Sequence, residues 1–242
     1  ARRGQVRQRT PGATLTTRLR GMFSHKGGGP WRLAVHVLEK GRKEGIKDVK
    51  AYNVVLKARI RIPESMIAVD EWMREDKLKQ MEGLFSQMKL DGLEPEVHTY
   101  NSLIHAYGQA GKEEGAVRLY EEMARGGVQP DRRTLSSMIV AHSWGSVNCM
   151  RRVAAEMETK GWLATRRAHS AMIGALHRVE DWKGVVDIAK AMLESKQALT
   201  EAGFAVAIKA ARSLGQADLG RRFLADYGKA KFRPKEALYA SV

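Results

Sequence analysis

Residues Val97–Asp131 read VHTYNSLIHAYGQAGKEEGAVRLYEEMARGGVQPD and contain two segments with helical periodicity. In each segment apolar side chains recur at positions i, i+3, i+4 and i+7, which places them on one face of an α-helix. Gly111 separates the two segments, and Gly126–Gly127 followed by Pro130 is typical of a helix C-terminus. The stretch therefore predicts two amphipathic helices joined by a turn. Their apolar residues are Tyr100, Leu103, Ile104, Tyr107, Ala116, Leu119, Tyr120 and Met123.

The same pattern returns at intervals of 34 or 35 residues. The isoleucines in register are Ile104, Ile139, Ile173 and Ile208, and a second series is Met123, Met157, Met192 and Tyr227. One helical hairpin of this size cannot bury its apolar face, whereas a stack of hairpins buries a continuous core. The period therefore predicts an α-solenoid with units at residues 97–131, 132–165, 166–200 and 201–235.

The residues of the first quoted unit resemble the pentatricopeptide repeat (PPR) family. The similarity rests on Tyr100–Asn101, Gly111, the stretch Tyr120–Met123 and the terminal Pro130–Asp131. The tetratricopeptide family fits less well, because its Trp-x-x-Leu-Gly opening is missing and its units are one residue shorter. The resemblance covers most of the chain from about Pro30 onward. It implies an all-α, right-handed solenoid of helical hairpins.

The remaining segments complete a solenoid of about six units over residues 30–242. Residues 30–48 are expected to be a partial first unit, residues 49–96 an expanded second unit, and residues 236–242 a C-terminal cap. Residues 63–75 (PESMIAVDEWMRE) are an insertion that predicts a short amphipathic helix. This helix either packs on the solenoid or docks a protein partner. The residues that would make the contact are Met66, Ile67, Trp72 and Met73.

Residues 1–29 differ from the rest in composition, because no acidic residue occurs before Glu39. Such a basic segment is expected to form an extended arm that is disordered when free. It is either the remnant of an organellar transit peptide or an arm that becomes ordered on RNA phosphates, and we favour the arm. The arginines expected to contact RNA there are Arg2, Arg3, Arg7, Arg9, Arg18 and Arg20.

The net charge of +15 indicates a polyanionic partner, most commonly a nucleic acid. Two arginine pairs, Arg132–Arg133 and Arg166–Arg167, open the first helices of consecutive units. Stacked units would place these pairs in a row along one edge, where they would contact phosphates without reading sequence. The single cysteine, Cys149, excludes a disulfide framework and fits a reducing compartment. No apolar run is long enough to span a membrane.

The resemblance also implies how bases are read. In PPR proteins the fifth and last residues of a unit meet the Watson–Crick edge of one base, and the second residue stacks on it. In residues 97–131 these positions hold Asn101, Asp131 and His98. The resemblance implies that the pair Asn101 and Asp131 reads pyrimidines, with uracil preferred, and that His98 stacks on the base. The other units offer less readable pairs, so little sequence discrimination is expected. Those pairs are Asn53 with Glu96, Ser136 with Thr165, Ser170 with Thr200, and Ala205 with Lys235.

Catalytic signatures are missing from the sequence. It contains no His-x-Glu with Cys-x-x-Cys, no Gly-x-Ser-x-Gly and no Walker A motif. The histidines on the repeated helices have no acidic or cysteine partner arranged with them in the sequence. We therefore expect no enzyme activity, no metal, no cofactor and no small-molecule substrate.

The sequence favours a structural RNA-binding component of an organellar ribonucleoprotein, most plausibly the mitochondrial ribosome. Its partners would be ribosomal RNA and other ribosomal proteins, and its location the mitochondrial matrix, with the plastid as the alternative. One alternative function is a soluble PPR factor that binds a short single-stranded RNA for processing or translation. The other is a protein-interaction scaffold in an organellar membrane or respiratory complex, for which RNA binding would be weak and insensitive to salt.

Overall fold

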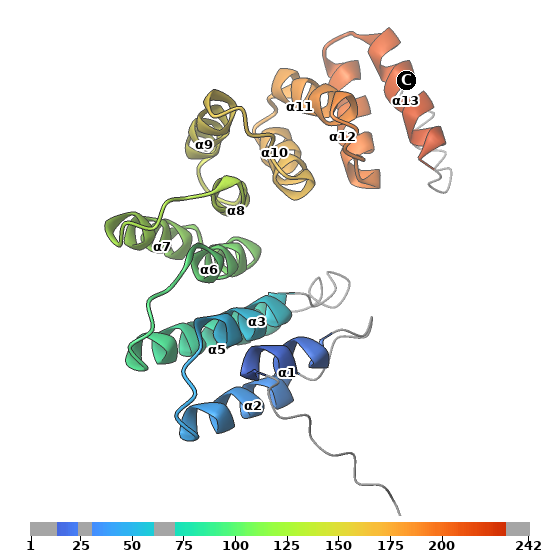
Figure 1. Cartoon of the computed structure of the whole chain (residues 1–242). Coiled ribbons are helices and arrows are strands. Elements are labelled where there is room, and N and C mark those ends of the chain that lie inside the picture. Colours follow the sequence, from blue (N-terminus) through green and yellow to red (C-terminus); the bar gives the residue numbers. More distant parts are fainter. Residues whose placement is uncertain (1–13, 24–30, 61–70, 231–242) are drawn as a thin grey trace, which may run out of the picture. The chain divides into compact units, whose positions relative to one another are not determined.

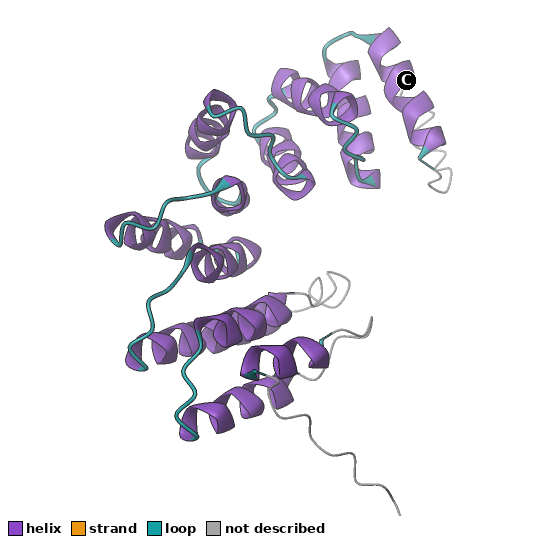
Figure 2. Ribbon diagram, viewed as in Figure 1, coloured by secondary structure: helices purple, strands orange, loops and turns teal. Residues whose placement is uncertain are grey.

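The computed structural model describes residues 14–23, 31–60 and 71–230 (Figure 1). Every regular element in these ranges is an α-helix, and short turns join the helices wherever the connection is described (Figure 2). The all-α prediction is therefore confirmed. The internal contacts divide the chain into two compact units, residues 1–106 and residues 107–242.

The first unit contains α1 (Leu15–Met22), α2 (Trp31–Lys43), α3 (Val49–Ile60), α5 (Glu71–Leu90) and most of α6 (Val97–Gln109). Helices α1, α2 and α3 contact one another, and α3 also packs against α5. Leu19, Leu38 and Tyr52 are among the fully buried side chains at the centre of this group. Phe85 of α5 and Tyr100 of α6 meet edge to face with ring centroids 5.8 Å apart.

Helix α1 corrects, for residues 15–22, the expectation that residues 1–29 form an extended arm. Thr14 caps this helix by accepting a hydrogen bond from the backbone N–H of Thr17, and the helix buries Leu15 and Leu19. Leu15 packs so closely on Gly41 of α2 that a Cβ at position 41 would lie 2.7 Å from the leucine side chain. The two leucines are four residues apart and so share one helix face. The segment therefore has an apolar stripe despite its charge.

Helix α1 packs against α2, so the two helices form a pair that precedes α3 in the chain. The partial first unit predicted at residues 30–48 thus belongs to a helix pair that begins earlier, at Leu15. Arg18 and Arg20 lie on the exposed side of α1. The remaining arginines predicted to contact RNA in this segment lie outside the described residues; they are Arg2, Arg3, Arg7 and Arg9.

The predicted insertion lies partly in α5. Trp72 and Met73 belong to the first turn of this 20-residue helix, which runs without interruption to Leu90. Of the residues 63–75 for which a short helix is expected, residues 71–75 form the start of α5, and the helix continues because no glycine or proline interrupts residues 71–82. Residues 63–70, which include Met66 and Ile67, lie outside the described residues.

The second unit contains α7 (Glu113–Arg125), α8 (Arg132–His142), α9 (Val147–Thr159), α10 (Arg166–Arg178), α11 (Trp182–Glu194), α12 (Glu201–Ser213) and α13 (Ala217–Lys229). Helices α8 and α9, α10 and α11, and α12 and α13 pair as hairpins. The first helices of these pairs stack directly, α8 on α10 and α10 on α12. A continuous core that includes Ile139, Ile173 and Ile208 runs through the stack.

The residue before each first helix of this unit is its N-cap. Asp131 forms a capping box with Thr134, and the side chains of Thr165 and Thr200 accept hydrogen bonds from the backbone N–H groups of Ala168 and Gly203. A side-chain cap of this kind satisfies an amide that would otherwise lack an intrahelical partner. The helices α6, α8, α10 and α12 begin at Val97, Arg132, Arg166 and Glu201, which are the first residues of the four repeats read from the sequence.

Candidate nucleic-acid interface

The two arginine pairs open neighbouring helices of the second unit. Arg132 and Arg133 are the first residues of α8, and Arg166 and Arg167 are the first residues of α10. Arg132, Arg133 and Arg166 are exposed, whereas Arg167 is half-buried. The Nε of Arg132 donates a hydrogen bond to the backbone carbonyl of Leu163 at 2.6 Å. Since Leu163 lies three residues before Arg166, the bond places the start of α8 beside the start of α10.

Arginine pairs elsewhere in this unit are partly neutralised by acids. On α9, Arg151 forms an ion pair with Asp181, and on α13, Arg221 forms one with Asp218. Near the end of α9, Lys160 pairs with Glu156 at 2.8 Å, and this hydrogen bond raises the pKa of Lys160. The positive charge of the second helices is therefore offset more than a count of arginines indicates.

Ser136, predicted to contact RNA, is only 4% exposed. Its hydroxyl oxygen accepts a hydrogen bond from the backbone N–H of Thr165 at 3.4 Å, and the hydroxyl points toward the sulfur of Met157. In this structure the side chain of Ser136 is therefore covered by protein, and its contact with RNA stays a prediction. The sequence alone could not reveal this, because the burial arises from α9 and from the turn before α10.

Asn53, the fifth residue of the expanded unit, is held within the protein. Its amide nitrogen donates to the carboxylate of Glu96 at 3.3 Å, and its amide oxygen accepts from the hydroxyl of Thr99 at 2.7 Å. The backbone N–H of Glu96 donates to the same hydroxyl at 3.1 Å. The structure thus brings the fifth and last residues of this repeat together. Both the amide nitrogen and the amide oxygen of Asn53 have protein partners.

The remaining predicted base-contact residues occupy varied surroundings. His98 is exposed in the first turn of α6, and Asn101, one helical turn further on, is half-buried in the first unit. Asp131 lies in the second unit, where its Oδ1 accepts hydrogen bonds at 2.8 Å from the backbone N–H groups of Arg133 and Thr134. Ser170 is half-buried on α10.

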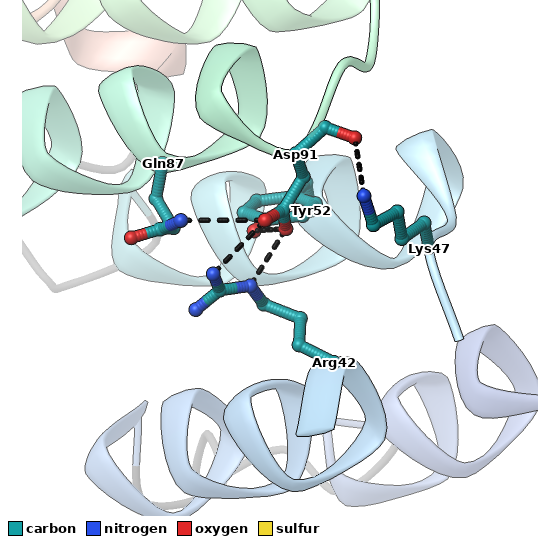
Figure 3. Close-up of polar contacts among 5 residues, drawn as sticks. All are labelled: Arg42, Lys47, Tyr52, Gln87 and Asp91. Atoms are coloured by element: carbon teal, nitrogen blue, oxygen red, sulfur yellow. Dashed lines mark hydrogen bonds and ion pairs between the residues drawn. The ribbon is translucent and has the colours of Figure 1, made fainter. Parts of the chain in front are cut away.

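The most perturbed titratable groups lie in the first unit around Asp91 (Figure 3). Arg42 donates two hydrogen bonds to the Asp91 carboxylate, from Nε at 2.6 Å and from Nη2 at 2.9 Å. The hydroxyl of Tyr52 donates to the same carboxylate at 2.7 Å, and Gln87 adds a bond at 3.3 Å. Lys47 donates to the Asp91 backbone carbonyl at 3.0 Å. The cluster therefore links the end of α2, the start of α3 and the end of α5.

In this cluster the pKa of Asp91 is lowered and the pKa values of Arg42 and Tyr52 are raised, as expected for a cluster that stabilises the fold. The hydrogen bonds from Arg42 hold the pKa of Asp91 well below its usual range, and the same bonds raise the pKa of Arg42. Burial, followed by the bond to Asp91, raises the pKa of Tyr52. Asp91 is too weak a base and Tyr52 too weak an acid for proton transfer near neutral pH. The sequence did not reveal this cluster, since Arg42 and Asp91 are 49 residues apart.

One histidine does have an acidic partner, contrary to the expectation from the sequence. Nδ1 of His142, which is buried, lies 2.6 Å from Oε1 of Glu113, and the other oxygen of Glu113 accepts from the backbone N–H of Ser146 at 3.2 Å. One imidazole and one carboxylate are fewer ligands than a structural metal site requires. No group of three or more such side chains that could hold a metal occurs in the described part of the chain. None of its helices has the length and apolar character needed to cross a membrane.

Residues 95–143 match the model of the PPR repeat family. Pentatricopeptide repeat-containing protein 10 of Zea mays, a chloroplastic protein, is 26% identical over 137 residues, which are 47% of this chain and 17% of that protein. A mitochondrial pentatricopeptide repeat-containing protein of Arabidopsis thaliana is 39% identical over 51 residues, which are 21% of this chain and 8% of that protein. The chain therefore spans less than a fifth of the length of either relative.

Two solved structures share the fold. One is the pentatricopeptide repeat protein PPR10 in complex with an 18-nucleotide psaJ RNA element, with a TM-score of 0.51 and 20% identity over 94% of this chain and 30% of that one. The other is the PPR domain of Arabidopsis thaliana protein-only RNase P 1 in complex with tRNA. Its TM-score is 0.57 at 16% identity, over 78% of this chain and 92% of that one. Residues 95–143 are therefore similar to the pentatricopeptide repeat, and the stacked helix pairs share the fold of these two structures.

Proposed function

We propose that this chain binds RNA mainly through phosphates, as a structural component of an organellar ribonucleoprotein. The observation that carries the proposal is the position of the two arginine pairs at the starts of the stacked helices α8 and α10. Residues 132–242 carry a net charge near +9, and neutralising phosphates releases counterions from RNA, which favours binding at low salt. Both solved relatives were crystallised with RNA, which supports RNA as the ligand class.

Positioning on RNA, with little reading of bases, is the mode of binding we propose. Ser136 is buried, and the amide of Asn53 is engaged by Glu96 and Thr99. These contacts leave His98, Asn101, Asp131 and Ser170 as the residues for which base contact is proposed first. Because one readable repeat discriminates poorly among sequences, contacts to phosphates supply most of the affinity.

We further propose that the assembly is the mitochondrial ribosome, with ribosomal RNA and ribosomal proteins as partners and no catalytic role for this chain. Two of the matched relatives are a chloroplastic and a mitochondrial protein, which supports an organelle as the location. A chain that contacts phosphates without strong sequence preference is better suited to a fixed position in a large ribonucleoprotein than to the selection of one messenger RNA.

The RNA-binding proposal is tested by fluorescence anisotropy with a labelled 20-nucleotide single-stranded RNA of mixed sequence at several salt concentrations. Replacing Arg133 and Arg166 by Ala should weaken binding and make the negative slope of log Kobs against log[salt] shallower by roughly 1.4, since each lost phosphate contact on a single strand contributes about 0.7 to its magnitude. The matched control replaces Arg221 and Arg222 of α13 by Ala, where Asp218 already pairs with one arginine. Equal losses in both variants would argue against the α8–α10 site.

The ribosomal proposal is tested separately by sedimentation of a mitochondrial lysate on a gradient, with and without RNase, followed by detection of this chain. We expect comigration with a ribosomal subunit that RNase abolishes. A light position that RNase does not change would contradict the ribosomal assignment. A light position that shifts with RNase would instead identify a smaller complex with RNA.

A further inference from the structure

The turn between α9 and α10 is held by side chains from two other segments of the second unit. The backbone carbonyl of Leu163 accepts from Nε of Arg132 at 2.6 Å, and that of Ala164 accepts from Nε2 of Gln197 at 3.0 Å. The backbone N–H of Thr165 donates to the hydroxyl of Ser136 at 3.4 Å. Three consecutive residues are thus each bound through the backbone, immediately before the arginine pair that opens α10.

Gln197 extends this set of bonds into α10 itself. Its Oε1 lies 3.0 Å from Nδ1 of His169, a residue that is only 6% exposed, while its Nε2 binds the carbonyl of Ala164. One carboxamide therefore connects the turn to the first turn of the helix that follows. The side chain of Thr165 then caps α10 by accepting from the backbone N–H of Ala168.

We propose that Arg132 and Gln197 are positioning residues, which fix the turn 163–165 so that the arginine pair of α10 lies in register with the arginine pair of α8. This inference rests on the RNA-binding function proposed above. The bond to Leu163 uses the single Nε–H of Arg132, so the four N–H groups on its terminal nitrogens are not needed for it. Arg132 therefore fastens the turn and also contributes its charge to the site.

Fixing the turn matters because flexible cations lose more conformational freedom when they bind a phosphate. Arg166 and Arg167 follow directly after the fastened residues, so the direction in which they leave the turn is set by the bonds to Leu163, Ala164 and Thr165. Loss of one fastening bond lowers the fraction of molecules in which both arginine pairs face the same RNA strand. The total charge of the site does not change.

The test separates geometry from charge with the variant Arg132→Lys. Lysine keeps the positive charge but has no N–H at the Nε position, so the bond to Leu163 is lost. We expect affinity for the labelled 20-nucleotide RNA to fall about 3- to 10-fold, with the salt slope unchanged. Hydrogen exchange of the Thr165 amide should become faster in the free protein. The matched control, Arg222→Lys on the exposed side of α13, makes the same change of residue type outside the site and should alter neither measurement by as much as twofold.

A second variant, Gln197→Leu, removes no charge and should also weaken RNA binding several-fold at an unchanged salt slope. Circular dichroism and thermal unfolding establish that each variant is folded. The proposal is overturned if Arg132→Lys binds RNA and exchanges as the wild type does, or if Arg222→Lys loses as much affinity. Failure of the wild-type chain to bind RNA would refute the proposed function instead. Faster exchange in Arg132→Lys would then still show that the turn is fastened.

Discussion

At the scale of single residues, Asp91 shows how one side chain can hold several elements together. It accepts hydrogen bonds from Arg42, Tyr52 and Gln87, so helices α2, α3 and α5 meet at one carboxylate (Figure 3). A bidentate arginine–carboxylate pair is stronger than a neutral hydrogen bond, and the partly buried position protects it from screening. The cluster favours one arrangement of these helices, since the Asp91 carboxylate accepts from one residue on each of α2, α3 and α5.

Replacement of Asp91 by Asn should destabilise the first unit by about 2 kcal/mol, because the Arg42 guanidinium loses its charged partner. The free energy of unfolding, measured by urea denaturation at pH 7, checks this value. The control Glu94→Gln changes an exposed carboxylate three residues away and should leave the free energy unchanged within error.

The same residue predicts a pH dependence. The pKa of Asp91 is depressed in the folded chain, so its stabilising contribution is fully present above the ordinary carboxyl pKa of about 4 and is lost as the pH falls toward the folded value. The difference in unfolding free energy between wild type and Asp91→Asn should therefore shrink below about pH 4. A difference that stays constant from pH 7 to pH 3 would contradict this account.

At the scale of elements, the turns between helices depend on a left-handed backbone conformation. Most of these positions are glycines, including Gly111 and Gly215, but Glu180 and Lys196 adopt φ values of 54° and 56°. A side chain at positive φ crowds the backbone, whereas glycine does not. The repeats therefore use the same turn geometry whether or not the sequence supplies the residue best suited to it.

Substitution of Glu180 by Gly should raise the free energy of unfolding by about 0.5–1 kcal/mol, because it relieves the strain at positive φ. Thermal and urea unfolding at neutral pH measure the change. The reverse substitution at an equivalent turn, Gly215→Ala, should destabilise by a similar amount. Destabilisation by Glu180→Gly would show that the glutamate side chain contributes more than its backbone conformation costs.

Helix α1 provides a second element whose role can be tested. Leu19 is fully buried between α1, α2 and α3, so Leu19→Ala should destabilise the first unit by about 2–4 kcal/mol through lost packing and the resulting cavity. The exposed neighbour Arg20→Ala serves as control and should change stability by less than about 0.5 kcal/mol. Urea unfolding followed by circular dichroism compares the two. Equal effects would mean that α1 does not belong to the core.

At the scale of the whole molecule, charge is distributed unevenly between segments. Residues 51–131 carry a net charge near −4, whereas residues 1–50 carry about +10 and residues 132–242 about +9. Anionic ligands are therefore directed away from the middle of the sequence by long-range repulsion and toward the segments on either side. This distribution favours contact with RNA through α8 and α10, whereas α5 carries as many acidic as basic side chains and has no net attraction for phosphates.

Addition of the 20-nucleotide RNA should therefore slow hydrogen exchange at the starts of α8 and α10 while leaving α5 unchanged. Exchange measured by mass spectrometry on the whole chain, at low and at high salt, checks both the location and its electrostatic origin. The protection should disappear as salt rises, because counterion release is the main driving force. Protection centred on α5 would contradict the proposed interface.

The sequence by itself determined the helical pairs, because the 35-residue period and the apolar spacing depend only on local geometry and on the need to bury one helix face. The prediction of an extended arm is wrong for residues 15–22, because it rests on their positive charge and not on the helical spacing of Leu15 and Leu19. Only the tertiary structure decided which polar residues are available for binding. Ser136 is buried by α9, Arg132 binds the turn before α10, and Asp91 joins residues far apart in the chain. The physical reason is that hydrogen-bond partners and burial come from neighbouring repeats, whose approach no local pattern encodes.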